Sequence, residues 1–129
     1  MNEFSQQSLA KLKSCEPDLQ ELFHHVLQLY DCTITDGHRN EIEQNECFRT
    51  GKSKVQYPDS KHNIYPSRAV DVAPYPIDWN DTKRFYYFAG LVKASASILG
   101  IEIRWGGDWD SDNDLNDQTF MDLVHYELL

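Results

Sequence analysis

The chain has 129 residues, 40% of them hydrophobic, and its twelve basic and twenty-one acidic residues give a net charge of −9. This length suits one domain, residues 1–129, with one core, and no apolar run approaches the roughly 20 residues of a membrane span. The acidic charge argues against a general nucleic-acid binder, which needs a basic face for phosphates. We expect a monomer.

The first half of the chain predicts three helices and one strand. Pro17 suits a first helical position, and apolar residues then recur at helical spacing as far as Tyr30. The other elements expected here are a short helix at 5–13, a strand at Cys32–Thr35, a short helix at Asn40–Phe48 and an irregular loop over residues 50–67.

The second half predicts three strands and a long helix. Asp81 is a good N-cap for a helix through Leu99, and Gly100 is its stop. The expected strands are Ala69–Ala73, closed by Pro74 and Pro76, then Ile101–Trp105 and Asp122–Leu129. Helices mixed with short, separated strands indicate an α+β fold, with helices packed on a small, mostly antiparallel sheet.

The N-terminus bears on where the chain is made, and the cysteines bear on the redox state of its thiols. No continuous apolar segment follows Met1, so no ordinary secretory signal is visible and we expect synthesis in the cytosol. Cys15, Cys32 and Cys47 are widely spaced, odd in number and without a CxxC pair. They indicate reduced structural thiols rather than a disulfide framework or a cysteine zinc site.

Asp71 stands in the middle of an otherwise apolar strand, AVDVA. Its neighbours Val70 and Val72 point to one face of the strand and Asp71 to the other. That second face is either solvent or a covered cleft. In a cleft the carboxylate needs a partner or a metal, because burying an unpaired charge is costly.

Two histidines extend Asp71 into a candidate metal site. His62, Asp71 and His125 offer two imidazoles and one carboxylate, and three protein ligands with an open fourth position are what a catalytic zinc requires. Zinc lowers the pKa of bound water to about 7, and Asp122 could take the water's proton and pass it to a leaving amine. The residues alone leave simpler readings open, since a lone histidine here is more often a core residue and Asp122 a cap or surface acid.

Several linked motifs carry a family resemblance. SKHNIYPSRAVDVAPYP, residues 60–76, resembles the SxH…AxD signature of VanY-type D-Ala-D-Ala carboxypeptidases and of their phage relatives, the L-alanyl-D-glutamate endolysins. DLVHYEL resembles the second signature, an acidic residue three before a histidine, and ITDGHR, GKSK and RWGGDWD extend the similarity from about Thr33 to the C-terminus. The spacer from His62 to Asp71 is longer than the commonest form and resembles a phage subgroup.

The resemblance implies a hedgehog/DD-peptidase-like fold and assigns roles to six residues. They are zinc ligands His62, Asp71 and His125, general base and acid Asp122, substrate- and oxyanion-binding Arg39, and Ser60, which orients the loop or contacts the peptide. A fixed cation beside a developing oxyanion favours the transition state, so the role implied for Arg39 is chemically sound.

The function implied is a zinc metallopeptidase that cleaves the stem peptide of bacterial peptidoglycan. A phage endolysin with L-alanyl-D-glutamate endopeptidase activity comes first, because a small domain and this motif form are typical of endolysins. D-Ala-D-Ala carboxypeptidase is the alternative within the enzyme class, and a non-catalytic hedgehog-like zinc module is the alternative outside it. The family also implies accumulation in the host cytoplasm and release to the wall through a phage holin.

The segment RWGGDWDSDNDLND supplies the last candidates. Gly106 and Gly107 permit close backbone approach, so this segment suits a cleft wall. Trp105 and Asp108 are candidate substrate-binding residues. Either Trp105 or Trp109 could pack against a peptide or sugar, or could instead pack in the core. A second cation, such as calcium, is a hypothesis for Asp108, Asp110, Asp112 and Asp114. An EF-hand needs glycine and glutamate where Asn113 and Thr119 stand, so the alternative is a solvated acidic loop.

Overall fold

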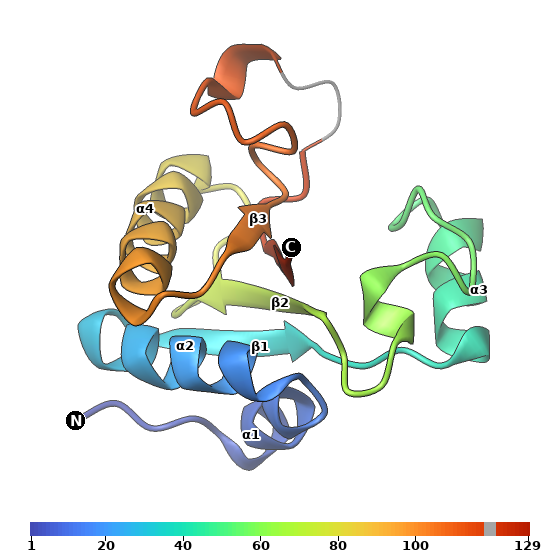
Figure 1. The fold of residues 1–129 in the computed structure, drawn as a ribbon, viewed down its shortest axis with the longest axis horizontal. Coiled ribbons are helices and arrows are strands. Elements are labelled where there is room, and N and C mark those ends of the chain that lie inside the picture. Colours follow the sequence, from blue (N-terminus) through green and yellow to red (C-terminus); the bar gives the residue numbers. More distant parts are fainter. Residues whose placement is uncertain (118–120) are drawn as a thin grey trace.

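The computed structural model describes residues 1–117 and 121–129, which contain four α-helices and a four-stranded sheet. Helices α1, α2 and α4 lie against the sheet, and α3 stands apart from it (Figure 1). In chain order the elements are α1 (Gln6–Lys13), α2 (Pro17–Leu29), β1 (Cys32–Asp36), α3 (Glu41–Arg49), a 3-10 turn η1 (Lys61–Asn63), β2 (Ala69–Pro74), α4 (Thr82–Leu99), β3 (Ile103–Trp105), a second 3-10 turn η2 (Leu115–Asp117) and β4 (His125–Leu128). The strand order is β1-β2-β4-β3, and each neighbouring pair is antiparallel. The predicted α+β class is confirmed.

Local polar contacts set the helix boundaries. Asn40 and Glu43 form a capping box at the start of α3, with side chain to backbone distances of 2.9 and 3.0 Å. Asp81 caps α4, and Gly100 ends it in the left-handed conformation at φ 73°. Each side-chain cap stabilises a helix by about 1 kcal/mol. These short-range contacts explain why the sequence predicted the ends of α3 and α4 to within one residue.

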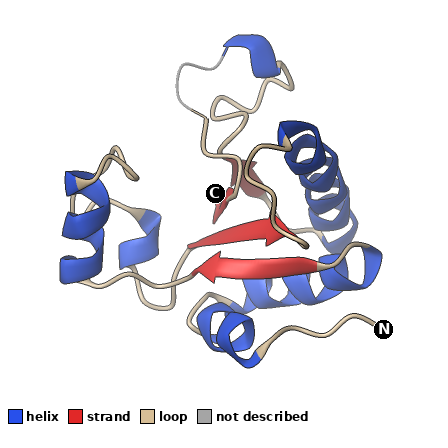
Figure 2. Ribbon diagram, turned by 180° about the vertical axis from the view of Figure 1, so that it is seen from behind, coloured by secondary structure: helices blue, strands red, loops and turns tan. Residues whose placement is uncertain are grey.

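The apolar face of the sheet packs against α2 and α4. Alternation along the strands places Ile34, Val70, Val72 and Tyr126 in one buried layer. The helices contribute the buried side chains Leu19, Leu22, Phe23, Val26 and Leu27 from α2 and Phe85, Phe88, Ala89, Val92 and Ala96 from α4. Figure 2, seen from behind, shows the opposite face of the sheet, with α3 set apart beyond the strand ends.

The same alternation lines up polar residues on the opposite face. The sheet register pairs Asp36 with Asp71 and Asp71 with His125, so three polar residues form one row across β1, β2 and β4. Asp71 is only 3% exposed. The solvent-facing interpretation of this aspartate is therefore wrong, because His62, from the loop that precedes β2, packs over it.

The strands differ from their predicted bounds at the ends. β1 and β2 each run one residue further, whereas β3 begins at Ile103 and β4 at His125 rather than at Ile101 and Asp122. Asp122 consequently lies in the turn before β4 instead of in the strand. Across residues 1–117 and 121–129, none of the helices has the length and apolarity needed to cross a membrane.

Candidate metal and catalytic site

His62, Asp71 and His125 converge on one point of the polar sheet face. His62 Nε2 lies 3.2 Å and His125 Nδ1 lies 3.3 Å from the same oxygen, Asp71 Oδ1. The two imidazole rings are 5.1 Å apart between centroids, and one ligand atom from each of the three residues lies within 4.8 Å of the others. All three residues are buried. The structure thus brings together two nitrogens and one oxygen from η1, β2 and β4.

The remaining polar atoms of these three residues are held by protein partners. His62 Nδ1 is 2.7 Å from the carbonyl oxygen of Gly37, and His125 Nε2 is 2.8 Å from Glu127 Oε1. An N–H on each of these outer nitrogens donates to an oxygen, which leaves His62 Nε2 and His125 Nδ1 as lone-pair donors toward the centre. This arrangement fits a metal ion with nitrogen and carboxylate ligands.

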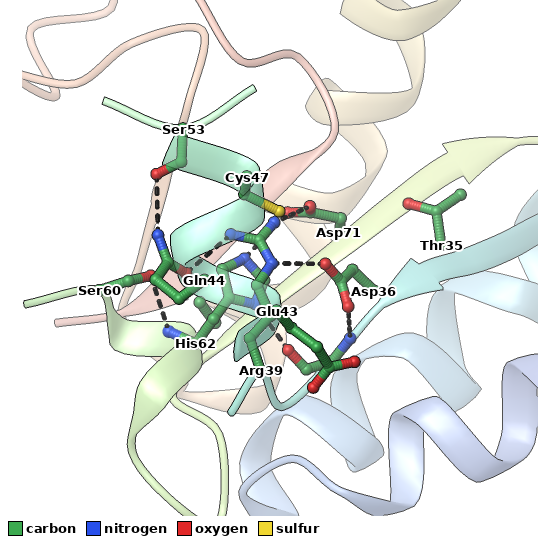
Figure 3. A network of polar contacts seen from close by, with 12 residues as sticks. Thr35, Asp36, Arg39, Glu43, Gln44, Cys47, Ser53, Ser60, His62 and Asp71 are labelled. Carbon is green, nitrogen blue, oxygen red and sulfur yellow. Dashed lines mark hydrogen bonds and ion pairs between the residues drawn. The ribbon is translucent and has the colours of Figure 1, made fainter. Parts of the chain in front are cut away.

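Arg39 fixes the third member of the set. Its Nη2 donates to Asp71 Oδ2 at 3.1 Å, its Nε to Asp36 Oδ2 at 2.5 Å, and its Nη1 to Gln44 Oε1 at 3.2 Å (Figure 3). Arg39 is 5% exposed, and its guanidinium engages all three acceptors at once. Asp71 therefore directs Oδ2 to Arg39 and Oδ1 to the histidines.

The electrostatic environment favours a negatively charged Asp71 and a positively charged His125. Burial alone would raise the pKa of Asp71, but His62 and His125 hold the pKa of this carboxyl well below its usual range. Burial would lower the pKa of His125, but the carboxylates of Asp71 and Glu127 raise it to about 9. A metal bound here takes the place of a proton on His125, because only the neutral imidazole is a ligand.

Asp122 lines the same cavity as His62 and His125. It lies at the start of the turn that leads into β4. Its backbone N–H donates to Gly106 O at 2.8 Å, and its carbonyl oxygen accepts from His125 N at 3.1 Å. Burial, followed by the negative charge of Asp71, raises the pKa of the Asp122 carboxyl above its ordinary value. A raised pKa keeps a carboxyl closer to the range in which it exchanges protons at neutral pH.

A cavity of about 540 Å³ gives access to these groups. Arg39, His62, Asp122 and His125 line it, together with Ser60. Ser60 also caps η1, where its Oγ accepts from His62 N at 3.1 Å, so this serine orients the loop that carries the histidine. A smaller cavity of about 210 Å³, with Trp79 and Phe85 in its wall, shares Asp122 with the first.

Two of the candidate substrate-binding residues do not line the large cavity. Trp105 is 4% exposed in the hydrophobic core, and its indole N–H donates to Leu123 O at 2.9 Å. It points away because β3 alternation places it beside Tyr126 on the apolar face. Trp109 takes the cavity position instead, with its ring centroid 5.2 Å from that of His125.

Asp108 is the second of these residues. It is 2% exposed, its Oδ2 accepts from Asn113 N at 2.9 Å, and Lys93 Nζ lies 3.8 Å away. The carboxylate therefore organises the acidic loop rather than the cavity wall.

The acidic loop brings together only part of its predicted cation set. One carboxylate oxygen each from Asp108, Asp110 and Asp112 lies within 4.8 Å of the others, whereas Asp114 Oδ1 accepts from Asn116 N at 2.9 Å. Thr119, the twelfth position of the EF-hand comparison, lies outside the described residues. Exposed acidic groups often gather like this without an ion, and we assign no cation here.

Two supporting residues escaped sequence reasoning. Glu127 could have been predicted, because alternation in the strand HYEL puts Glu127 on the same face as His125. Gln44, which is fully buried and contacts Arg39, gives no signal in the sequence, since it is one of several polar residues in a short helix with little amphipathic pattern.

Comparisons with known proteins find L-alanyl-D-glutamate peptidases. The family model described as phage L-alanyl-D-glutamate peptidase matches residues 1–129. The chain is 32% identical over 120 residues to the L-alanyl-D-glutamate peptidase of Escherichia phage T5, covering 89% of this chain and 87% of the relative. It also resembles the crystal structure of the Serratia marcescens L-Ala D-Glu endopeptidase ChiX, with a TM-score of 0.78, 26% identity, and coverage of 99% of this chain and 91% of the other.

Proposed function

Because the chain belongs to the phage L-alanyl-D-glutamate peptidase family, we propose that this peptidase cleaves the L-alanyl-D-glutamate bond in the stem peptide of bacterial peptidoglycan. The observation that carries the proposal is the convergence of His62 Nε2, Asp71 Oδ1 and His125 Nδ1. Asp122 lines the same cavity as the two histidines. Two buried histidines oriented by outer hydrogen bonds fit a metal site, and Asp122 beside them supplies a group that can accept a proton.

We infer that the convergent atoms hold a zinc ion. The donor set is two nitrogens and one carboxylate oxygen, and the outer atoms of all three residues already have partners. When bound, zinc supplies Lewis acidity, which polarises a carbonyl and activates water near pH 7.

The protein groups around this centre would move and stabilise charge. Asp122 accepts a proton at its carboxylate during attack and returns it to the nitrogen of the departing glutamate, and its raised pKa suits both steps. Arg39 keeps Asp71 in place and presents a fixed positive charge at the cavity wall, where negative charge develops in the transition state.

The named relatives favour the endopeptidase over the two alternatives. Both are L-alanyl-D-glutamate peptidases by name, which favours this bond over the D-Ala-D-Ala bond. The presence of Asp122 and Arg39 beside the three ligand candidates favours an enzyme over a binding module. We further propose a monomer that accumulates in the host cytoplasm and reaches the wall after release through a phage holin.

Purified peptidoglycan tests the proposal. The protein is incubated with it in the presence of zinc, with a chelator, and as the Asp122→Ala variant. We expect new amino groups only from the zinc-loaded wild type, and mass spectrometry should find fragments that begin with glutamate. Release of free alanine would identify a carboxypeptidase instead. If zinc-loaded protein frees no amino groups, the peptidoglycan peptidase proposal fails.

A further inference from the structure

We propose that Lys52 binds the free carboxylate of the glutamyl residue at the scissile bond, and that it thereby selects unamidated stem peptides. This inference rests on the proposed function. Glutamate has two carboxyl groups, of which one continues the stem peptide and the other remains as a free acid or an amide. An enzyme that cuts on the amino side of this residue has to accommodate that group next to its catalytic centre.

The cavity wall contains four lysine and arginine side chains, and two of them are committed to protein acceptors. Arg39 is 5% exposed and donates to Asp36, Gln44 and Asp71. Lys61 Nζ lies 3.1 Å from Glu127 Oε2 and also donates to a backbone carbonyl. Binding a substrate carboxylate with either of them would disturb a group that orients a ligand candidate.

Lys52 and Lys54 are the other two cations of the cavity wall. The side chain of Lys52 is exposed, and within the described part of the chain it has no ion-pair partner. Asp59, Asp110 and Glu127 also line the cavity, so its total charge is not strongly positive. A substrate carboxylate therefore needs one particular cation. Lys54 already has an interaction partner, which leaves Lys52 as the available one.

Gln44 fixes the loop of Lys52 to the catalytic groups. Its Nε2 donates to Ser53 Oγ at 3.0 Å, and its Oε1 accepts from Arg39 at 3.2 Å (Figure 3). The same Nε2 also donates to Val55 O at 2.7 Å. Gln44 is completely buried. The backbone on the C-terminal side of Lys52 is thus tied, through one amide, to the guanidinium that holds Asp71. This anchoring fixes the backbone beside Lys52, whose side chain lines the same cavity as Asp122 and the two histidines.

Two matched substrates test the assignment. They are muropeptides identical except that the second carboxyl of the glutamyl residue is free in one and amidated in the other. We expect wild-type enzyme to prefer the free acid by about tenfold in kcat/KM, as a charged hydrogen bond predicts. In Lys52→Met this preference should fall close to one, and in Lys52→Arg most of it should remain. Lys83→Met is the control, because Lys83 is an exposed lysine of α4 outside the cavity wall.

The outcomes separate this inference from the proposed function. Equal cleavage of both substrates by wild type, or an unchanged preference in Lys52→Met, overturns the role of Lys52 while leaving the peptidase in place. Failure of zinc-loaded wild type to cut either substrate overturns the proposed function itself. Because Lys52 is exposed, its variants should have the same melting temperature as the wild type, which a thermal scan verifies.

Discussion

Substituting Gly106 by alanine should strongly reduce the rate of catalysis, because the new methyl group would displace the backbone of Asp122. A Cβ atom at Gly106 would lie 2.1 Å from the carbonyl oxygen of Asp122 and 3.0 Å from its Cβ. Ordinary van der Waals contact begins at 3.4 Å. The turn must therefore shift by about 1.3 Å, the difference between 3.4 and 2.1 Å. A misplacement of about 1 Å in a catalytic group can cost about 100-fold in rate, or about 2.7 kcal/mol in the barrier.

The assay compares kcat/KM on a soluble muropeptide with zinc content and melting temperature. We expect Gly106→Ala to lose about 100-fold in kcat/KM, with overpacking that costs about 1–3 kcal/mol of stability. Gly90→Ala is the matched control, because a Cβ there meets no heavy atom within 4 Å. It should keep full activity and gain about 0.5–1 kcal/mol as a helix-interior glycine replaced by alanine. Wild-type kcat/KM in folded Gly106→Ala would refute the argument.

Three further expectations follow from the site and the core. His62→Ala should reduce zinc to well below one per chain by elemental analysis, and full stoichiometry would remove His62 from the ligand set. Asp122→Ala should keep its zinc but lose at least about 100-fold in turnover, and near-normal activity would rule out its proton-transfer role. Burial raises the pKa of Cys15 and Cys32 to about 12, so at pH 8 only about one in ten thousand of these thiols is the reactive thiolate. Iodoacetamide should accordingly modify the partly exposed Cys47 alone, with the other two protected until denaturant is added; rapid labelling of all three would contradict the buried core.

The helices and strands in residues 1–117 and 121–129 could largely be predicted, because the sequence features that specify them are local. Apolar spacing in α2, the caps of α3 and α4, and the glycine at the end of α4 involve residues within one or two turns of each other. The strand ends were less accurate, since β3 and β4 extend only as far as each finds hydrogen-bonding partners. That pairing depends on residues more than twenty positions apart.

By itself, the sequence determined the family and the set of chemical groups. Its motifs contain His62, Asp71, His125 and Asp122, and the resemblance to peptidoglycan peptidases is confirmed by the family match over residues 1–129. Strand alternation also showed that Asp71 leaves the apolar face, although it did not say what lies on the other side.

The tertiary structure alone decided which groups meet. The register between β2 and β4 places Asp71 opposite His125, and that pairing is fixed by long-range backbone hydrogen bonds. The pairing of β3 with β4 turns Trp105 into the core, while the loop after β3 brings Trp109 to His125. Gln44 acquires its role from burial among Arg39 and the loop of Lys52, because a polar side chain removed from water must find partners wherever the fold provides them.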